Sequence, residues 1–238
     1  MKNSLVIACD FPGRKELEGF MDFFGNEKLF LKIGMEMFYQ EGPGIIHTIK
    51  DAGHDIFLDL KLHDIPNTVK SAMKGLAKLD VNMVNVHAAG GRAMMEAALE
   101  GLEAGTASGN KRPACIAVTQ LTSTSTSQMN LEQLIPGEVR NSVLHYAALT
   151  RHAGLDGVVC SSHEARDIHK KLGQGFLTVT PGIRPSGSDL HDQKRVATPS
   201  NARMLGSDII VVGRAITSNP DPYKAYMSIR KEWEGAAV

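Results

Sequence analysis

The sequence predicts a single-domain (β/α)8 TIM barrel that spans residues 1–238. Three observations lead to this prediction. Short β-rich segments recur at a spacing of about 30 residues, amphipathic segments lie between most of them, and there are eight such repeats. Strand–helix alternation is typical of parallel βαβ units, and eight units in a chain of this length are enough to close a barrel. A doubly wound open sheet is the alternative, because local patterns cannot show whether the sheet closes.

The eight expected strands are rich in Val, Ile, Leu and Phe. They are residues 4–10, 29–34, 55–61, 83–88, 113–120, 157–161, 176–182 and 208–214. Segments 14–24 and 69–79 have the apolar spacing of helices. Two polar segments are expected to be loops: 121–130 (LTSTSTSQMN) after the fifth strand and 185–193 (PSGSDLHDQ) after the seventh. Loops at these strand ends build barrel active sites, and the second could act as a lid.

The composition excludes some classes of protein. Lys plus Arg and Asp plus Glu both number 26, a balance that argues against a nucleic-acid binder, although a locally basic pocket stays open. No apolar run has the length of a membrane span, and no secretory signal is recognisable. The three cysteines, Cys9, Cys115 and Cys160, lie in apolar strands without disulfide or zinc-ligand spacing. We therefore expect a cytoplasmic protein with buried, reduced cysteines.

Charged side chains occur inside the expected third strand. Residues 58–64 read LDLKLHD, so the three leucines face one side of the strand while Asp59 and Lys61 face the other. In a barrel, the leucines would pack under the outer helices and the charged pair would point inward. On the second strand, Lys32 likewise faces away from Leu31 and Ile33, and Asp10 is the last residue of the first strand. We expect all four to meet at one mouth; an ion-pair network that only supports the fold is the alternative, but buried pairs are weak stabilisers.

An array of alternating lysines and aspartates keeps its members charged by mutual attraction. At about 4 Å and an effective dielectric near 20, each contact contributes roughly 4 kcal/mol before desolvation is subtracted. A lysine held protonated in this way is suited to stabilise developing negative charge and then to donate a proton.

Metal chemistry is the competing interpretation of the array. Asp10 and Asp59 could hold magnesium if the second strand supplied another carboxylate, but it supplies Lys32, whose ammonium would repel the ion. His63 and His87 also lie at strand ends, where single histidines are more often hydrogen-bonding groups than ligands. The sequence therefore predicts no metal, and it assigns no role to the two histidines.

A phosphate site is expected where the seventh and eighth strands end. Gly213 would let the backbone approach an anion, Arg214 supplies a forked cation, and an adjacent helix N-terminus would add N–H donors. Arg184 follows the seventh strand. A Gly-Arg pair after a strand is a weak signal alone, and its place on these two strands of a barrel strengthens it.

Residues 59–68 (DLKLHDIPNT) resemble the D-x-K-x-x-D-I-x-x-T signature of the orotidine 5′-phosphate decarboxylase family. Other segments resemble the bacterial branch of that family, in order, along nearly the whole chain: ACDF, LFLKIGMEMFYQEGP, VNVHAAGG, AVTQLTS, LDGVVCS, LTVTPGIRP, DQKRVATP and VVGRAIT. Collinear agreement of this extent is highly specific.

The resemblance implies a (β/α)8 homodimer that converts orotidine 5′-phosphate to UMP and CO2, the last step of pyrimidine nucleotide synthesis, without metal or cofactor. It places Lys32, Asp59, Lys61 and Asp64 in a catalytic tetrad. Asp64 would enter the neighbouring subunit's site together with the residues around Thr68.

The resemblance also implies a set of substrate contacts. Asp10 would bind the ribose, and Lys32, Asp59 and Thr68 would touch the substrate as well. Thr122 would meet the pyrimidine edge; some branches have Ser there, so this departure keeps the hydroxyl. The phosphate would be bound by Arg184, Gln193, Gly213 and Arg214, with Gln193 on the long loop.

Two other functions compete with this interpretation. Magnesium-dependent decarboxylases or aldolases of ketose phosphates share the Asp-x-Lys-x-x-Asp strand but place a glutamate on the second strand, where this chain has Lys32. A catalytically silent, nucleotide-sensing barrel is the other competitor, and a pure binder has no need of a buried Lys–Asp array.

Overall fold

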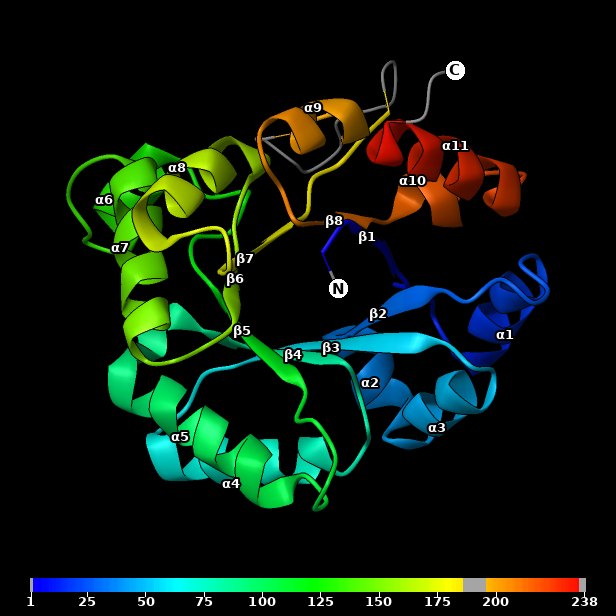
Figure 1. The fold of residues 1–238 in the computed structure, drawn as a ribbon, viewed down its shortest axis with the longest axis horizontal. Coiled ribbons are helices and arrows are strands. Elements are labelled where there is room, and N and C mark those ends of the chain that lie inside the picture. The colour runs from blue at the N-terminus through cyan, green and yellow to red at the C-terminus, as the bar shows by residue number, and fades with distance from the viewer. Residues whose placement is uncertain (1, 186–195, 236–238) are drawn as a thin grey trace.

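The chain forms a closed barrel of eight parallel strands in the computed structural model, which describes residues 2–185 and 196–235. Each strand pairs with the next along the chain, and β8 lies beside β1 where the ring closes (Figure 1). The (β/α)8 prediction is confirmed, and the open-sheet alternative is excluded. The strands are β1 (Ser4–Ala8), β2 (Phe30–Gly34), β3 (Asp55–Leu62), β4 (Met83–His87), β5 (Ala114–Val118), β6 (Gly157–Val159), β7 (Leu177–Thr180) and β8 (Ile209–Val212).

The helices lie outside the barrel and cover its strands (Figure 1). They are α1 (Arg14–Asp22), α2 (Met35–Glu41), α3 (Gly44–Asp51), α4 (Pro66–Ala77), α5 (Gly91–Gly105), α6 (Thr126–Glu132), α7 (Val139–His152), α8 (Ser162–Leu172), α9 (Pro199–Met204), α10 (Arg214–Thr217) and α11 (Pro222–Glu234), with a 3-10 turn η1 at Ala88–Gly90. The described chain has no helix that combines the length and apolar character needed to cross a membrane.

Most strands end earlier than the sequence predicts. The expected first strand, for example, extends to Asp10, whereas β1 ends at Ala8. The expected fifth strand extends to Gln120, and β5 ends at Val118. In both cases backbone pairing continues for one more residue: the Cys9 N–H donates to the Lys32 carbonyl at 3.0 Å, and the Thr119 N–H donates to the Val159 carbonyl at 3.2 Å.

The predicted loop 121–130 is wrong in its second half, because α6 begins at Thr126. Ser125 caps this helix: its hydroxyl accepts a hydrogen bond from the Gln128 backbone N–H at 3.2 Å, and the Gln128 side chain accepts one from the Ser125 N–H at 3.3 Å. This is a capping box of the form S-x-x-Q. The predicted loop 185–193 lies outside the described residues except for Pro185.

Apolar side chains form separate layers inside and outside the sheet. Leu31, Ile33, Leu58 and Leu60 pack outward under the helices, as the alternation on the second and third strands predicts. The barrel interior holds another group: Val6, Ala8, Phe57, Met83, Ile116, Val179, Ile209 and Val211. All three cysteines are buried and form no disulfide, which confirms the prediction of buried, reduced cysteines.

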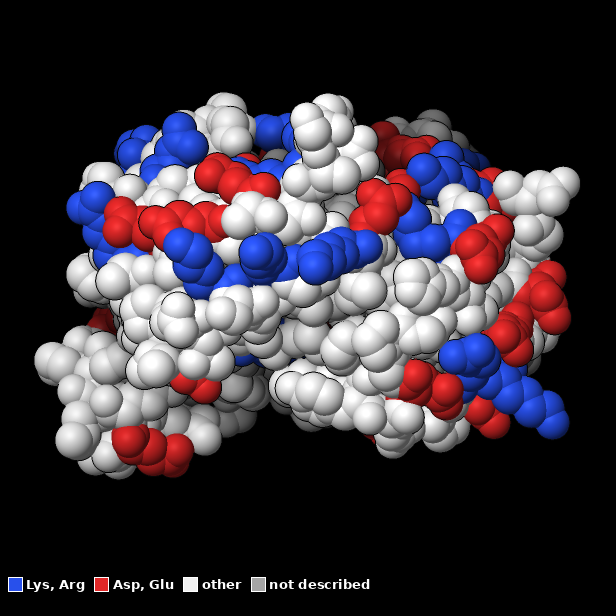
Figure 2. Space-filling view, turned by 90° about the horizontal axis from the view of Figure 1, so that it is seen from below, with Lys and Arg blue, Asp and Glu red and all other residues white. Residues whose placement is uncertain are grey.

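Helices α4 and α5 pack with their backbones very close together. A Cβ atom on Gly101 of α5 would lie 2.2 Å from the Lys70 carbonyl oxygen of α4, so only glycine fits there. Figure 2 views the molecule from this side and shows a row of basic side chains flanked by acidic ones. Between α4 and α5, Lys70 pairs with Glu100 at 2.6 Å. The face therefore carries both signs of charge.

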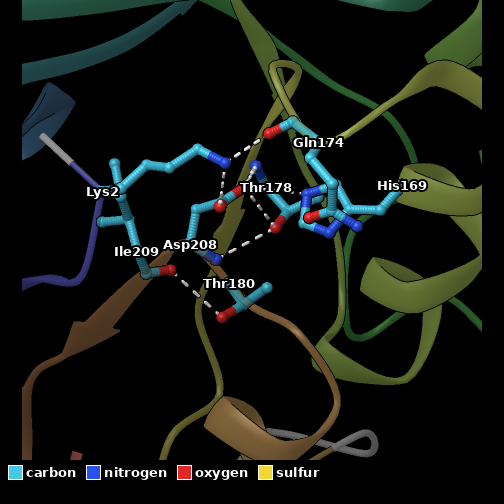
Figure 3. Close-up of polar contacts among 7 residues, drawn as sticks. All are labelled: Lys2, His169, Gln174, Thr178, Thr180, Asp208 and Ile209. Atoms are coloured by element: carbon cyan, nitrogen blue, oxygen red, sulfur yellow. Dashed lines mark hydrogen bonds and ion pairs between the residues drawn. The ribbon is translucent and has the colours of Figure 1, made fainter. Parts of the chain in front are cut away.

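A polar cluster with a buried centre lies at the amino-terminal ends of β7 and β8 (Figure 3). The Asp208 carboxylate accepts hydrogen bonds from the Thr178 N–H at 2.9 Å and the Thr178 hydroxyl at 3.1 Å. It also contacts His169 Nε2 at 2.9 Å and Lys2 Nζ at 3.0 Å, and Lys2 reaches the Gln174 carbonyl. The cluster joins the start of the chain to α8 and to both strands.

Candidate active site

Four charged side chains meet at the carboxyl-terminal mouth of the barrel. Lys32 on β2 has its Nζ 3.3 Å from Asp59 Oδ2 on β3 and 3.3 Å from Asp10 Oδ1, just after β1. Lys61 Nζ lies 2.8 Å from Asp59 Oδ1. The charges alternate along the series Asp10, Lys32, Asp59, Lys61, which is the convergence that the strand alternation predicts.

The members of this cluster differ in their exposure to solvent. The side chains of Asp59 and Lys32 are 10% and 12% exposed, that of Lys61 is 27% exposed, and that of Asp10 is 60% exposed. Buried charges interact more strongly than exposed ones because less water screens them. The Lys32–Asp59–Lys61 part of the series is therefore its electrostatic core.

The cluster keeps its buried members ionised. Burial by itself raises the pKa of Asp59, but the charges of Lys32 and Lys61 and hydrogen bonds from Lys61 and Asn85 leave that pKa below its ordinary value. Burial lowers the pKa of Lys32, and the carboxylates of Asp59 and Asp10 outweigh this effect and raise it. At neutral pH Asp59 is a carboxylate and Lys32 is an ammonium.

The backbone of Lys61 is in the left-handed region, with φ of 52°. A residue with a side chain seldom adopts this conformation, which costs about 1–3 kcal/mol and needs support from its surroundings. It occurs where the register between β3 and β4 shifts, between Leu58 and Leu62. The period-two alternation of the sequence does not reveal this bulge.

A cavity of about 230 Å³ opens beside the cluster. Its charged lining consists of Lys32, Asp59 and Lys61, and Thr122 of the β5–α6 loop lies on its wall as well. The remaining lining is largely apolar: Phe57, Val118, Gln120, Leu121, Ser123, Val159, Val179, Pro181 and Val211. Charged groups against an apolar wall act through a low local dielectric, so they can stabilise charge that develops on a bound molecule.

The predicted phosphate residues lie at the ends of β7 and β8, which are neighbours in the barrel. The Arg184 backbone N–H donates to the Ala197 carbonyl at 2.9 Å, which joins the two ends of the long β7–α9 connection. Gly213 precedes α10, and Arg214 is its exposed first residue. Gln193 lies outside the described residues.

Asp64 and Thr68 do not join the cluster within this chain. Both are exposed, and the Asp64 carboxylate accepts a hydrogen bond from the Ile65 N–H at 2.6 Å. Within the described residues, Asp64 forms no ion pair with Lys61. The neighbouring Ile65 is 66% exposed.

The two unassigned histidines lie next to the cluster. The rings of His63 and His87 are 5.6 Å apart between centroids. Burial is the main cause that lowers the pKa of His87, and the charges of His63 and Lys61 add to it. His87 is therefore held in its neutral form more strongly than an exposed histidine.

Three features of the site were missed by the sequence reasoning. Asn85 on β4 is buried and bonds to Asp59, and Gln120 is buried and donates to the Ser142 hydroxyl at 3.1 Å. A Cβ atom on Gly34 would lie 3.3 Å from Lys32 Nζ, so this glycine gives the lysine its space. A signal for Asn85 was present, since a polar residue between valines in a buried strand needs hydrogen-bonding partners.

The described residues contain no group of three or more His, Cys, Asp and Glu side chains placed to hold a metal ion. Within the mouth itself, the two carboxylates Asp10 and Asp59 are separated by Lys32, which contacts both.

The profile of the orotidine 5′-phosphate decarboxylase / HUMPS family matches residues 3–229. The orotidine 5′-phosphate decarboxylase of Bacillus cytotoxicus is 59% identical over 238 residues, covering all of both chains. That of Lysinibacillus sphaericus is 62% identical over 234 residues, covering 98% of this chain and all of the relative.

Solved structures are similar over nearly the whole chain as well. An uncharacterized conserved protein from Geobacillus kaustophilus has 52% identity and a TM-score of 0.87, covering 96% of this chain and 99% of its own. Orotidine 5′-phosphate decarboxylase from Lactobacillus acidophilus has 42% identity and a TM-score of 0.87, covering 97% and 98%.

Proposed function

The chain belongs to the orotidine 5′-phosphate decarboxylase / HUMPS family, and we propose that it decarboxylates orotidine 5′-phosphate to UMP and CO2 without metal or cofactor. The observation that carries the proposal is the position of Lys32, between Asp10 and Asp59 at the barrel mouth. A magnesium-dependent relative would need an acidic ligand there. Full-length relatives that carry the decarboxylase name support the same reaction.

Lys61 is the proposed proton donor. When the bond between C6 and the carboxylate breaks, CO2 leaves and the electron pair stays on C6 as a carbanion. The pyrimidine ring offers no electron sink for that pair, so a nearby cation must stabilise it. The Lys61 ammonium then transfers a proton to C6, which gives UMP and a neutral amine that water reprotonates.

Asp59 positions this lysine. Its Oδ1 holds Lys61 Nζ at 2.8 Å, and Lys32 on its other oxygen keeps the carboxylate ionised. In the proposed complex, the substrate carboxylate leaves from beside Asp59, so loss of CO2 removes a repulsion between two negative charges.

The remaining predicted residues bind the parts of the substrate that do not react. We assign the ribose to Asp10 and the pyrimidine edge to Thr122, which lies on the cavity wall. The phosphate is assigned to residues at the ends of β7 and β8: Arg184, Gln193, Gly213 and Arg214. Contacts remote from C6 supply binding energy that orders the reacting groups.

The active form is proposed to be a cytoplasmic homodimer in which Asp64 and Thr68 complete the partner's site. Their exposure in the single chain, next to the 66% exposed Ile65, supports this assignment. Lys61→Ala and Asp64→Ala proteins should each be inactive, yet mixed and re-associated subunits should regain about a quarter of the wild-type activity, because half of the dimers then carry one intact site. No recovery in confirmed mixed dimers would contradict the shared site.

The reaction itself is tested by the absorbance change of orotidine 5′-phosphate with purified protein in EDTA. We expect loss of substrate with equimolar UMP. If there is no turnover in EDTA but turnover of a ketose phosphate once magnesium is restored, the chain instead has the activity of the magnesium-dependent relatives.

A further inference from the structure

Asn85 is a polar residue in the middle of a buried strand. It lies on β4 between Val84 and Val86, and it is 1% exposed. A buried amide is costly unless both its donor and its acceptor are satisfied. The partners of Asn85 therefore show what the residue does.

The side chain of Asn85 bridges two members of the charged cluster. Its Oδ1 accepts a hydrogen bond from the Lys61 backbone N–H at 2.8 Å. Its Nδ2 donates to Asp59 Oδ1 at 2.6 Å, and the same Asp59 oxygen holds Lys61 Nζ at 2.8 Å. The orientation of the amide is determined by its partners, because a backbone N–H can only donate and an ionised carboxylate can only accept.

These bonds lie at the irregularity of β3. Leu58 pairs with Val84 and Leu62 pairs with Val86, so β3 has two extra residues in this interval. A bulge leaves some backbone groups without a partner in the neighbouring strand. At this bulge, the Lys61 N–H donates instead to the side-chain oxygen of Asn85. The bond thus supports the one residue of the bulge whose φ is positive.

We infer that Asn85 is a positioning residue for the reaction, which holds the left-handed backbone of Lys61 and the carboxylate of Asp59 so that the Lys61 ammonium faces the cavity. The inference rests on the proposed function. Asn85 is not in the cavity lining, so it acts through Asp59 and Lys61 instead of through the substrate.

The chain contains a matched amide at the other end of the same two strands. Asn82 Oδ1 accepts from the Ile56 N–H at 2.8 Å, and its Nδ2 donates to Asp55 Oδ1 at 3.0 Å. This amide thus joins β3 to the start of β4 in the same manner, but Asp55 pairs there with Lys28, away from the mouth. Asn82 is therefore a control for loss of strand support without loss of site geometry.

The test compares Asn85→Asp with Asn82→Asp. In each variant, the new carboxylate can still accept the hydrogen bond from the backbone N–H of β3. When it is ionised, its other oxygen faces the neighbouring aspartate, to which the original amide donated a hydrogen bond. For Asn85→Asp we expect kcat to fall by on the order of 100-fold at pH 8 with UMP affinity within about threefold, as for loss of one positioned group. For Asn82→Asp we expect kcat within about threefold of wild type, because its partners lie outside the site.

The pH profile separates positioning from general support. When the introduced carboxyl is protonated, it can donate to Asp59 as the amide did, so the deficit of Asn85→Asp in kcat should shrink as pH falls from about 8 to about 5. Asn82→Asp should keep the wild-type profile of kcat.

The inference is overturned if Asn85→Asp keeps kcat within threefold of wild type with an unchanged profile, or if Asn82→Asp loses as much. If Asn85→Asp does not fold, Asn85→Ala replaces it. This variant should bind UMP and turn over slowly, and near-normal turnover would overturn the inference too. Failure of the wild type to form UMP would instead refute the proposed function, so the two failures are distinguishable.

Discussion

Asp59 and Asp208 are both buried carboxylates that pair with a lysine, but they lie at opposite ends of the barrel. Asp208 receives a backbone N–H, a hydroxyl, an imidazole and Lys2, which come from separate parts of the chain (Figure 3). Asp59 receives the amide of Asn85 from the buried side and the ammonium groups of Lys32 and Lys61, which line the mouth.

The difference shows what each buried charge contributes. The donors around Asp208 join the start of the chain, α8, β7 and β8, so their hydrogen bonds support the fold. The donors around Asp59 include two cations that line a cavity, and Lys61 is held there in a strained backbone conformation. We therefore expect changes at Asp208 to affect stability and changes at the mouth to affect catalysis.

The largest expected effect is that of Lys61→Ala. Turnover should fall by at least about 10⁴-fold, because the variant loses both the charge that stabilises the carbanion and the proton donor. UMP binding should stay within one or two orders of magnitude of wild type. Steady-state kinetics and UMP titration measure the two quantities. Lys28→Ala is the control, because Lys28 pairs with Asp55 on the same strand at the other end and should leave kcat unchanged; near-normal turnover by Lys61→Ala would refute the proposed role.

Asp208→Ala should have the opposite effect. It leaves the Thr178 N–H and the Lys2 ammonium without their carboxylate, which should lower the free energy of unfolding by about 3 kcal/mol and Tm by about 6–12 °C. Below the new Tm, kcat should equal that of wild type. Asp208→Asn keeps a hydrogen-bond acceptor, so its free energy of unfolding should fall by less than that of Asp208→Ala. A large loss of kcat in folded Asp208→Ala would contradict the expectation that Asp208 contributes to stability and only the mouth to catalysis.

Gly34→Ala is a smaller perturbation of the mouth. The new Cβ would lie 3.3 Å from Lys32 Nζ and 3.4 Å from Asp10 Oδ1, so the ion pair has to shift by a few tenths of an ångström. We expect kcat/KM to fall by about 3–10-fold, as for a small misplacement of binding groups. Gly19→Ala on α1 has open space around it and serves as the control. Equal kinetics for both variants would show that the mouth tolerates crowding at Gly34.

The smallest expected effect is a pH dependence of stability from His87. Its pKa is lowered mainly by burial, so in the acid range the folded chain binds fewer protons there than the unfolded chain. The stability that neutral His87 contributes is complete above its ordinary pKa of 6.5 and is lost as pH falls through the lower folded value. Denaturant titrations at several pH values should show wild type losing stability relative to His87→Asn as pH falls. If the difference in stability between the two proteins does not change with pH, then folding does not disfavour protonation of His87.

Many of the strands and the placement of the charged side chains can be predicted from local sequence. The eight apolar segments identified the strands, and the alternation in LDLKLHD separated the leucines under the helices from the charges in the mouth. The alternation works because neighbouring side chains of a strand point to opposite faces whatever the partner strand is. The capping box at Ser125 was also readable, but the surrounding run of Ser and Thr obscured it.

The assignments of Asp64, Thr68 and Gln193 depend on resemblance to the family. Asp64 and Thr68 are exposed in the single chain, and no strand or helix pattern connects them to the cluster. The role proposed for both residues is in a neighbouring subunit, and such a role leaves no local signal because the partners belong to another copy of the chain.

Local sequence is sufficient to predict the order of the elements, the face on which each strand side chain lies and the alternation of charge toward the mouth. The closure of the sheet, the shift of register between β3 and β4, and the contact of Asn85 with Lys61 and Asp59 become visible only in the folded chain. It also brought Lys2, His169 and Thr178 to Asp208. The physical reason is that side-chain direction is a property of one strand, whereas register, closure and hydrogen-bond partners depend on segments far apart in the sequence.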